Sequence, residues 1–528
     1  MTLIAVIDSE TDPFAPGVIP KPFVWGFYDG TMFYKFWGDD CTEQLIAFLK
    51  NYEEPLLLYA HNGGKFDFFF LLDHINSELR IVNNRILQCW IGAHELRDSY
   101  AIIPIPLRAY EKDEIDYDKM HRSKRELHKP EITKYLRGDC VYLYELVTGF
   151  HKEFGDKLTI GGTAMKELKK FHSFASAGPE YDKFFRQFYF GGRNQCFKSG
   201  TIQGDYKIYD VNSMYPFVMK EYKHPVSVQH EIQRKIGPKT MFASIEARNY
   251  GALPIRTKTG IDFTCERGTF FASIHEIQAA QETGTLEITR VKWTVDFAQT
   301  ISFDSFVDHF YSQRLKAAAA NDKMRVLFYK LVLNSAYGKF AQNPENYFEH
   351  YLTRMEMLEQ PWEVAEQNGE FLIWRKPSPV KTYYNIATAA SITAAARAVL
   401  LRGLSAAVDP VYCDTDSIIC QKLVAEMDKT KLGAWKLEAV GNSLAIAGKK
   451  LYAVFEDIEC VKQASKGAKL TPDQIKTIAQ GGKVMFENPV PNFKLDGSTQ
   501  FINRTLKATA KPYAWKSNGK RSTKQLAV

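Results

Sequence analysis

The sequence predicts an α/β protein of several domains, and three observations support that prediction. The chain has 528 residues, which exceeds the size at which a single hydrophobic core stops growing. Its composition is that of an ordinary globular protein, because 45% of the residues are hydrophobic and 24% are charged. Strand-like and helix-like segments both recur along the chain. We therefore expect several packed units that combine both kinds of element.

The first 165 residues predict a mixed α/β unit. Helical periodicity occurs at Phe68–Ile75 and again at Ile132–Phe150. Before and between these stretches, Val, Ile and aromatic residues lie between turn residues, which favours strands. Small residues cluster at Gly161 and Gly162 and again at Ser173–Pro179, so a boundary is expected at one of these two places. The segments with the strand pattern are residues 1–8, 22–38 and 56–59.

The rest of the chain predicts a second, larger α/β unit. A strand is expected at Tyr206–Val211, followed by a helix-like stretch and then by a β-rich region that extends to about Phe303. An irregular segment at 343–379 contains Tyr, Trp, Lys and Pro, which is typical of an inserted hairpin. The remaining predicted elements are helices at 303–319, 324–341 and 386–404 and a hairpin at 410–420.

Positive charge is concentrated at the carboxyl end of the chain. The formal net charge is +7, which is modest for this length. The end of the sequence is rich in Lys and Arg, which suits a polyanion such as a nucleic acid. A solvated terminus is the alternative explanation. The basic residues are Arg504, Lys507, Lys511, Lys516, Lys520, Arg521 and Lys524.

The sequence argues against disulfides, zinc and a membrane span. Its eight cysteines are scattered and include no C-x-x-C pair, which is typical of a reducing compartment. The most apolar stretch, 383–404, carries Arg397 and Arg402 and predicts a packed helix. A candidate catalytic residue, Asp8, comes too early for a leader peptide to precede it. We expect a cytoplasmic protein with no membrane partner.

Four acidic residues in the first unit suit phosphodiester cleavage. Asp8 and Glu10 stand two residues apart, so a strand would present both carboxylates on one face. Asp67 follows a glycine turn, and Asp139 lies four residues after Tyr135, so a helix would place that pair together. Cleavage with two metal ions needs carboxylates that converge on one point. Taken singly, each residue is more often a helix cap or a solvated charge.

A second acidic set lies in the larger unit. Asp414 and Asp416 lie within the apolar run 411–419, where two acids are costly unless a cation neutralises them. A plain turn rich in Asp and Thr is the alternative. Asp210 ends the strand expected just before it, and nucleotide addition needs carboxylates that converge from distant parts of a chain.

Polar and aromatic residues accompany this second set. Tyr215 follows a turn that would present backbone amides, which suits a triphosphate, and its ring suits exclusion of a bulkier sugar. Lys330, Asn334 and Tyr337 recur at helical spacing and would line one face. A cation, an amide and an aromatic ring suit a phosphate, a base edge and a stacked base. The alternative is an amphipathic helix whose polar side chains face water.

Three segments resemble, in order, motifs A, B and C of family B DNA polymerases. They read D-V-N-S-M-Y-P at 210–216, K-L-V-L-N-S-A-Y-G-K at 330–339 and Y-C-D-T-D-S at 412–417. The resemblance implies that Asp210 and Asp416 hold metal ions, with Val211 also at the metal and nucleotide site and Asp414 nearby. Tyr215 resembles the gate against ribonucleotides. Lys330 would bind the incoming triphosphate, with Asn334, Tyr337 and Gly338 close to the nascent base pair and DNA.

Two shorter motifs resemble DNA contacts of the same family. The sequence K-L-Y at 450–452 resembles the K-x-Y motif that steadies the primer strand, through Lys450 and Tyr452. The sequence Y-F-G-G at 189–192 resembles the Y-x-G-G motif between two activities, through Tyr189, Gly191 and Gly192. Glycines at these positions would let the backbone approach DNA closely.

The first acidic set resembles the three exonuclease motifs of proofreading domains. These read D-x-E, then N-x-x-x-F-D at 62–67, then Y-x-x-x-D at 135–139. The resemblance implies that Asp8, Glu10, Asp67 and Asp139 hold metals and that Tyr135 takes part in catalysis. Asn62 and Phe66 would contact DNA. Ser99 and Lys112 resemble a DNA-contacting serine and an assisting lysine of the protein-primed branch, although that branch usually has leucine where this chain has Tyr100.

The resemblance implies a fold, cofactors and partners. An RNase H-like 3′-5′ exonuclease domain would span 1–165, and a right-hand polymerase domain would span 166–528. Two Mg²⁺ ions are implied at each active site, and Mn²⁺ can substitute. DNA template and primer strands and dNTPs are the implied ligands of a monomer. The implied subdomains are a palm at about 186–235 and 380–465, a first insertion at about 225–300, fingers at about 303–342, a second insertion at about 343–379 and a thumb at about 466–528.

The compact length favours the protein-primed branch of the family, because 528 residues hold both activities. By resemblance, the first insertion would dock a terminal protein and the second would encircle DNA, which gives strand displacement. One alternative is an enzyme of the same fold that extends ordinary primers in replication or repair. Another is a nucleic-acid-binding protein with an inactive site, which the complete set of expected carboxylates disfavours.

Overall fold

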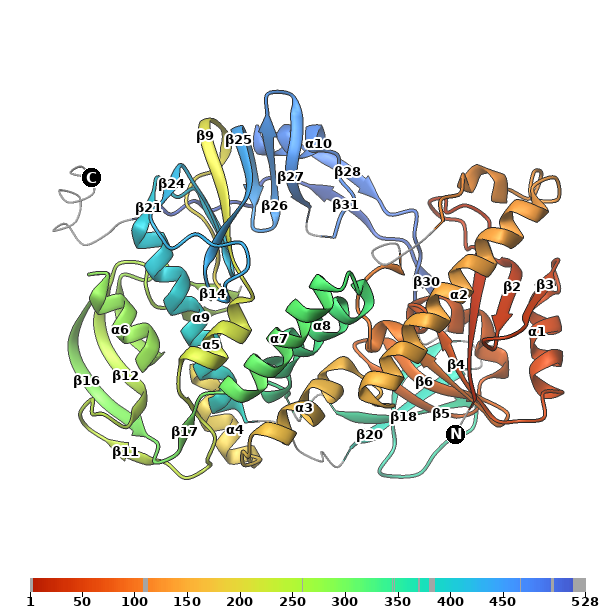
Figure 1. Cartoon of the computed structure of the whole chain (residues 1–528), viewed down its shortest axis with the longest axis horizontal. Helices are drawn as coiled ribbons and strands as arrows, with labels where there is room; N and C mark the ends of the chain where they lie inside the picture. Colours follow the sequence, from red (N-terminus) through yellow and green to blue (C-terminus); the bar gives the residue numbers. More distant parts are fainter. Residues whose placement is uncertain are drawn as a thin grey trace.

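The structure is a computed structural model that describes residues 3–107, 113–258, 260–343, 345, 347–368, 371–378, 385–465, 467–494 and 498–515. The amino-terminal domain lies at one side of the molecule in Figure 1, and the sheets of the larger unit lie at the other. Blue elements near the carboxyl end span the distance between these two parts, and two green helices lie below them. The α/β multidomain prediction is confirmed.

The amino-terminal domain is built on one twisted sheet with helices on both faces. Strand β1 pairs in parallel with β4, and β4 pairs in parallel with β7. Alternate residues of β1 face opposite ways, so Ala5 and Ile7 pack with helix α1 (Cys41–Lys50) while Val6 packs with helix α2 (Lys129–Phe154). The strands of this domain are β1 (Leu3–Thr11), β2 (Pro22–Tyr28), β3 (Phe33–Trp37), β4 (Leu56–Ala60), β5 (Glu78–Val82), β6 (Arg85–Ile91) and β7 (His94–Asp98).

Most of the amino-terminal elements match the sequence prediction, with two differences. The helix expected at 68–75 is a 3₁₀ helix, η2 (Asp67–His74), rather than an α-helix. The first of the two expected boundaries, Gly161 and Gly162, and the domain limit at 165 fall inside helix α3 (Ile160–Phe171), whereas the alternative, Ser173–Pro179, covers the segment between α3 and the next helix. Thr159 caps this helix by accepting a hydrogen bond from the Gly162 backbone, so the glycines lie in its first turn. The other short helices here are η1 (Gly63–Lys65), η3 (Ser99–Ala101) and η5 (Tyr117–Met120).

A seven-stranded antiparallel sheet lies in the ranges expected for the palm, and we call it the palm sheet. Its strand order is β27-β26-β25-β9-β23-β22-β8, so β9 is central and is flanked by strands from much later in the chain. The hairpin expected at 410–420 is confirmed as β22 and β23. The strands are β8 (Asn194–Cys196), β9 (Gly200–Val211), β22 (Tyr412–Asp414), β23 (Ser417–Cys420), β25 (Trp435–Gly448), β26 (Leu451–Glu456) and β27 (Glu459–Ser465).

Helices pack behind the palm sheet. Helix α9 (Ile386–Ala406) is long and apolar enough to cross a membrane by length and composition alone, but 89% of that stretch is buried inside the protein. It packs against α5 (Met214–Glu221) and α6 (Ile274–Glu282), which is the behaviour of a core helix. Smaller elements around it are α4 (Pro179–Phe185), η6 (Arg186–Phe188), β10 (His224–Pro225), β17 (Thr300–Ile301), β21 (Ala407–Val408) and β24 (Lys422–Leu423).

The region expected to be β-rich up to about residue 303 is a four-stranded sheet with one helix. The order of this first insertion is β11-β16-β12-β15, and helix α6 packs on it. That helix was not expected from the sequence. The strands are β11 (Glu231–Gln233), β12 (Thr240–Asn249), β15 (Arg267–Ser273) and β16 (Leu286–Asp296), with a small hairpin of β13 (Ile255–Thr257) and β14 (Gly260–Asp262).

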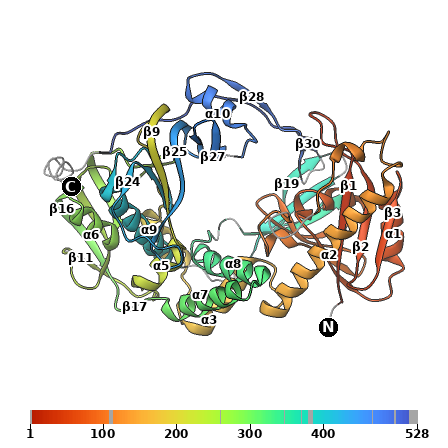
Figure 2. The ribbon, with the colours of Figure 1, turned by 45° about the horizontal axis from the view of Figure 1, so that its top comes forward.

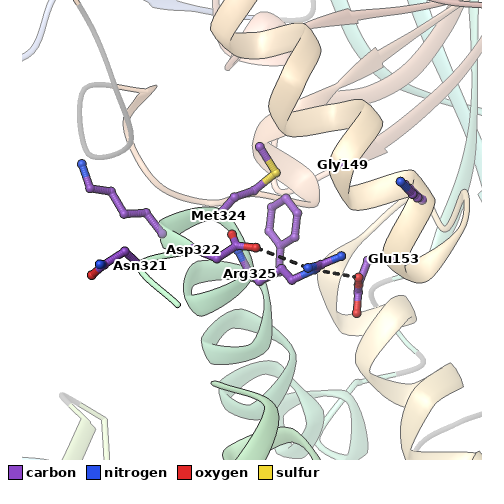
Figure 3. Close-up of a pocket in the computed structure, with 9 residues that line it drawn as sticks. Gly149, Glu153, Asn321, Asp322, Met324 and Arg325 are labelled. Atoms are coloured by element: carbon purple, nitrogen blue, oxygen red, sulfur yellow. Dashed lines mark hydrogen bonds and ion pairs between the residues drawn. The ribbon is translucent and has the colours of Figure 1, made fainter. Parts of the chain in front are cut away.

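The fingers are the helical pair α7 (Asp304–Ala319) and α8 (Lys323–Phe340), which confirms both predicted helices. Their tip lies against α2 of the amino-terminal domain. Figure 3 shows this junction, where Glu153 lies 3.4 Å from the Arg325 guanidinium and both residues line a cavity of about 610 Å³. Tyr329 donates a further hydrogen bond of 2.6 Å to Glu153. The amino-terminal domain and the fingers are therefore in direct polar contact.

The second insertion joins the amino-terminal sheet. Its strands are β18 (Phe348–Arg354), β19 (Glu363–Asn368) and β20 (Phe371–Pro377), and β18 pairs with β5. The result is a ten-stranded sheet with the order β19-β20-β18-β5-β6-β7-β4-β1-β2-β3. Figure 2 shows β19 beside the strands of the amino-terminal domain. An ion pair of 2.7 Å between Arg354 and Asp73 reinforces the junction.

The thumb connects the palm to the amino-terminal domain. Helix α10 (Pro472–Ala479) packs on β25 and β26, and the strand pair β28 (Val484–Glu487) and β31 (Asn503–Leu506) extends away from it. The outer hairpin consists of β29 (Asn492–Phe493) and β30 (Thr499–Gln500). Phe493 is 7% exposed and stacks on Phe69 with ring centroids 5.4 Å apart. The thumb is thus attached at both of its ends.

Candidate active sites

Three acidic side chains converge in the amino-terminal domain. Asp8 and Glu10 lie on β1, and Asp139 comes from the facing helix α2, with carboxylate oxygens that all lie within 4.8 Å of one another. Among the described residues, this is the only group of three or more potential metal ligands so close together. The expectation that Asp8 and Glu10 share one face of a strand is confirmed. Carboxylate oxygens at this spacing fit a hard divalent cation.

Asp67 lies close by but is not part of that group. It begins η2, and its Oδ1 accepts a hydrogen bond of 2.5 Å from the Ser9 hydroxyl. Ser9 stands between Asp8 and Glu10 on β1, so its side chain leaves the strand on the opposite face. Burial raises the pKa of Asp67 to about 7, although the Ser9 hydrogen bond opposes the shift. The structure therefore brings together three of the four predicted carboxylates.

Tyr135 accompanies Asp139 on α2, one helical turn earlier. Its ring is buried, and its hydroxyl lies 3.0 Å from the hydroxyl of Tyr117. Burial raises the pKa of the Tyr135 phenol, and the nearby Glu10 and Asp139 carboxylates act in the same direction. A protonated phenol beside the acidic group is a hydrogen-bond donor for a phosphate or for water.

The predicted DNA contacts of this domain have different environments. Asn62 adopts a left-handed backbone conformation, with φ of 64°, and its side-chain oxygen accepts a bond of 2.9 Å from Arg85. Phe66 lies edge-on to Phe14, with centroids 5.6 Å apart. Ser99 differs from the prediction, because it is fully buried and its Oγ lies 2.9 Å from Nδ1 of His61. Its hydroxyl supports the core, and Lys112 lies outside the described residues.

The second acidic set converges at the end of the palm sheet. Asp210 is the penultimate residue of β9 and lies opposite Ser417 on β23, the residue after Asp416. The Val211 backbone donates a hydrogen bond of 2.9 Å to the carbonyl of Asp416, which fixes the two chain segments side by side. Asp414 ends β22, and the Asp416 backbone donates to its carbonyl over 2.6 Å. The β-ladder thus brings together acids that are far apart in the sequence.

The electrostatics of this set depend on two lysines. Lys436 Nζ lies 3.0 Å from an oxygen of Asp210, and Lys450 Nζ lies 3.3 Å from an oxygen of Asp414. Burial and then the neighbouring Asp210 raise the pKa of Asp416 to about 7. Burial also raises the pKa of Asp210, although Lys436 opposes that shift. Neighbouring half-buried carboxylates favour a cation between them.

Motif A and the fingers meet through two tyrosines. Tyr215, in the first turn of α5, stacks on Tyr337 of α8 with ring centroids 3.8 Å apart. Lys330 and Asn334 are exposed earlier on α8, and Gly338 is exposed beside Tyr337. The helix therefore presents a polar stripe that ends at the tyrosine pair.

The segment Y-F-G-G lies against the turn of motif C. Gly192 has no room for a side chain, because a Cβ there would lie 2.7 Å from the Thr415 hydroxyl. The Tyr189 carbonyl accepts a bond of 2.6 Å from Arg256. The Gly191 carbonyl accepts a bond of 2.9 Å from Arg397. This packing fixes the backbone beside the two acids of motif C.

The K-L-Y segment turns between β25 and β26 beside motif C. Lys450 has a left-handed backbone with φ of 55°, and its backbone N–H donates 2.9 Å to the Tyr412 hydroxyl. The rings of Tyr412 and Tyr452 lie 4.9 Å apart. Lys450 therefore reaches Asp414 from a turn held by a buried tyrosine.

Two residues of the palm site were not found from the sequence. Arg314 of α7 donates a bond of 3.3 Å to the hydroxyl of Ser213, which lies within motif A. Lys436 pairs with Asp210 from β25. Neither residue lies in a recognisable motif, and an isolated basic residue carries no positional signal. Only the folded arrangement identifies them.

Comparisons with known proteins agree with this geometry. A family model described as "DNA polymerase type B, organellar and viral" matches residues 105–423. The DNA-directed DNA polymerase of Enterobacteria phage PRD1 is 48% identical over 541 aligned residues, covering 96% of this chain and 98% of that protein. The DNA polymerase of Bacillus phage phi29 is 25% identical over 455 residues, which covers 75% of this chain and 74% of that protein. A phi29 DNA polymerase structure covers 96% of this chain and 100% of that chain, with a TM-score of 0.72 and 19% identity.

The fold and its palm site define a nucleic acid polymerase of type B. The chain belongs to the protein-primed family B DNA polymerases and is a DNA-directed DNA polymerase of the phage type. A 3′-5′ exonuclease is implied by this family.

Proposed function

We propose that the chain copies a linear genome from a terminal-protein primer, adding nucleotides at the palm site and excising mismatched ones at the amino-terminal site. The observation that carries the proposal is the presence of two separate acidic centres. One joins β1 to α2, and the other joins β9 to the turn between β22 and β23. Both activities transfer a phosphoryl group, for which convergent carboxylates are the expected protein ligands.

Two Mg²⁺ ions at each centre are part of the proposal, and Mn²⁺ can substitute. Asp8, Glu10 and Asp139 would hold cations in the amino-terminal domain, with Asp67 nearby. In the palm, Asp210 and Asp416 would hold them, with Val211 and Asp414 alongside. Bound ions would neutralise phosphate charge and favour ionisation of the attacking oxygen. The raised pKa of Asp416 supports this assignment, because a neighbouring cation would restore its charge.

Template DNA, a primer strand and dNTPs are the proposed ligands of the palm. The solved phi29 polymerase complex contains primer-template DNA and incoming nucleotide substrates. Here Lys330 and Arg314 would bind the triphosphate, because both are cations on the fingers helices beside motif A. Tyr215 would lie under the sugar of the nucleotide, where a 2′ hydroxyl would meet its ring. Asn334 and Tyr337 would contact the nascent base pair.

The primer strand would lie along the two motifs that flank the acids of motif C. Lys450 and Tyr452 would steady it from the β25–β26 turn. Tyr189, Gly191 and Gly192 would let it approach the backbone closely. The 3′ hydroxyl would then attack the α-phosphorus of the nucleotide, and pyrophosphate would leave.

Excision would occur when the primer end frays into the amino-terminal domain. Asn62 and Phe66 would hold the single strand, since a ring accepts a stacked base without sequence preference. Tyr135 would donate a hydrogen bond to the reacting phosphate, because its raised pKa keeps the phenol protonated. Water would attack the terminal phosphodiester and release a nucleoside monophosphate.

The two insertions would supply the properties that distinguish protein priming. The sheet of β11, β12, β15 and β16 would dock the terminal protein. The strands β18 to β20 would form a wall beside the template, rigidly joined to the amino-terminal sheet through β5. A wall that excludes the second strand would favour strand displacement.

Reciprocal substitutions test the two-centre assignment. Asp416→Ala should abolish nucleotide addition to a DNA primer and leave degradation of single-stranded DNA intact. Asp8→Ala should do the opposite, since the two centres lie in separate domains. Each variant serves as the folding control for the other. Loss of both activities in both variants would contradict the assignment.

A separate assay tests priming. The purified chain is incubated with labelled dATP, template and a candidate terminal protein, and transfer of dAMP to a hydroxyl of that protein is measured. A labelled adduct that disappears with Asp416→Ala supports the proposal. Extension of DNA primers without any adduct on any candidate protein would favour the ordinary-primer alternative.

A further inference from the structure

Arg193 is a buried cation directly after the Y-F-G-G segment. Its side chain is 1% exposed, and both its Nε and one Nη donate to Gln195 Oε1, over 3.0 and 2.6 Å. In the described part of the chain, no carboxylate forms an ion pair with it. Burial lowers the pKa of this guanidinium to about 10. A charge so placed needs another source of stabilisation.

Three aromatic rings supply that stabilisation. The guanidinium carbon lies 4.5 Å from the ring centre of Phe263, 5.2 Å from that of Trp515 and 5.7 Å from that of Phe197. Planar guanidinium groups stack favourably on aromatic faces, more so away from water. Phe263 comes from the first insertion, Trp515 from the carboxyl-terminal segment, and Phe197 from the residue directly after strand β8. Arg193 therefore joins three parts of the molecule.

The carboxyl-terminal segment is anchored where it reaches this cluster. The Thr509 and Ala510 backbones both donate to the Ala447 carbonyl, over 2.8 and 3.0 Å. The Tyr513 backbone donates 3.2 Å to the Cys196 carbonyl, and the Tyr513 hydroxyl donates 3.3 Å to Glu266. Trp515 is half-buried against the palm. The segment 509–515 thus forms a strap across the palm.

The backbone of Arg193 holds the turn of motif C. Its carbonyl accepts a hydrogen bond of 2.6 Å from the Thr415 backbone, between the two acids. Strand β8 begins at the next residue and pairs with β22, with Asn194 opposite Asp414. Thr415 has a left-handed conformation with φ of 58°, which a β-branched residue adopts only when its surroundings impose it. Arg193 is therefore positioned to hold Thr415 in this left-handed conformation.

We propose that Arg193 is a positioning residue of the polymerase site, and that Trp515 of the strap and Phe263 hold it so that the Asp414–Asp416 turn keeps its geometry. The inference rests on the proposed assignment of Asp416 to the palm centre. It links nucleotide addition to a segment at the far carboxyl end and to the first insertion. The amino-terminal centre has no contact with this cluster among the described residues, so excision is independent of it.

Steady-state kinetics of Arg193→Met and Trp515→Ala test the proposal. The expected result for both is a kcat for dNMP addition about 100-fold lower, because small displacements of reacting groups carry costs of this size. The KM for dNTP should stay within about twofold, since the nucleotide contacts are untouched. Degradation of single-stranded DNA should be unchanged. The double variant should be no slower than Arg193→Met alone, because both changes break one unit.

Conservative variants separate positioning from general stability. Trp515→Phe keeps an aromatic face and should recover kcat to within about threefold of the original. Arg193→Lys keeps the charge but lacks a planar group that stacks, so it should remain slow. Tyr513→Phe removes only the hydroxyl bond to Glu266 and is the matched control, with both activities unchanged.

Two outcomes would overturn the proposal. One is an unchanged kcat in both Arg193→Met and Trp515→Ala. The other is an equal loss of synthesis and excision in Trp515→Ala, which would make the cluster a general structural support. Loss of both activities in Arg193→Met is also the result expected of a misfolded variant, and Trp515→Ala then gives the test. Loss of synthesis alone in Trp515→Ala supports the proposal, and equal loss of synthesis and excision overturns it. Full nucleotide addition by Asp416→Ala would instead refute the assignment of the palm centre, which is a distinguishable failure.

Discussion

The rings of Tyr215 and Tyr337 lie face to face, with centroids 3.8 Å apart and planes inclined by 15°. One ring belongs to motif A and the other to the fingers helix α8. Burial raises the pKa of both phenols, so both stay protonated at neutral pH. Each ring restrains the other, which couples the proposed sugar contact to the position of the fingers.

Tyr215→Val should relax sugar selection. The ring that would meet a 2′ hydroxyl is removed, and insertion of ribonucleotides should rise by about 10- to 100-fold relative to deoxyribonucleotides. Tyr337→Val should have a smaller effect in the same direction, because Tyr215 loses the ring that restrains it. The measurement is the ratio of kcat/KM for rATP and dATP. An unchanged ratio in Tyr215→Val would remove that residue from the proposed role.

The buried pair of Arg397 and Glu276 should be important for stability. Both side chains are 2% exposed, and Arg397 Nε donates 2.7 Å to Glu276. Arg397 also donates to the carbonyls of Phe190 and Gly191. Glu276→Gln leaves a buried cation without its counter-charge, which costs about 3 kcal/mol. The thermal unfolding midpoint should fall.

The matched control for that change is Glu282→Gln. Glu282 forms a comparable ion pair of 2.7 Å with Arg402, but its side chain is 57% exposed. Exposed pairs contribute about 0–1 kcal/mol, so its unfolding temperature should hardly change. Equal shifts in the two variants would contradict the argument from burial.

Acid should destabilise the palm through two buried histidines. Burial lowers the pKa of His224 to about 3 and that of His275 to about 4. Their neighbours are largely neutral: His224 lies 2.9 Å from the Ser391 hydroxyl and 2.9 Å from the Val218 carbonyl. His275 donates to the Lys223 carbonyl, and Arg402 opposes its protonation.

The direction of this pH effect follows from proton binding. The unfolded chain binds protons at these histidines below about pH 6.5, whereas the folded chain does so only near pH 3 to 4. Stability should therefore fall as the pH drops below 6.5, by about 2 kcal/mol per histidine at pH 5. Thermal unfolding at pH 7.5 and pH 5 measures the effect. His275→Gln should show a smaller difference in unfolding temperature between pH 7.5 and pH 5 than the original chain. An equal difference would show that His275 is not a source of the acid sensitivity.

Phe493→Ala should weaken the contact between the thumb and the amino-terminal domain. Phe493 touches Phe66, Phe69 and Phe70, with ring centroids 5.4–5.7 Å apart. Losing this ring should cost the junction about 2 kcal/mol and shorten the product made per binding event. The measurement is product length with excess competitor DNA. Met485→Ala is the matched control, because that side chain is 71% exposed on β28 and should leave product length unchanged.

Local patterns predicted the elements that carry the chemistry. The period-two spacing of Asp8 and Glu10 and the hairpin of motif C were both confirmed. Both depend on neighbours in the sequence, which a pattern records directly. The 3₁₀ helix at Asp67 was expected as an α-helix, because both kinds of helix bury similar apolar faces. Helix α6 was not predicted because strand-like segments flank it on both sides.

Long-range arrangements could not be predicted in the same way. The pairing of β18 with β5 depends on two strands from separate parts of the chain, and neither strand encodes its partner. Ser99 was expected at DNA, but the adjacent core and His61 enclose it. The cluster around Arg193 draws two of its three rings, Phe263 and Trp515, from distant segments of the chain. Such contacts are properties of the folded chain.

The double attachment of the thumb has a mechanical consequence. A thumb attached only to the palm could move freely at its outer end. Here the outer end is held, because Phe493 stacks on Phe69 of the amino-terminal domain. Burial of the Phe493 ring alone contributes about 2 kcal/mol, so the thumb should stay joined to both domains for most of the time. A DNA strand with a free end could enter without breaking this contact, whereas a closed circle could enter only after the contact breaks.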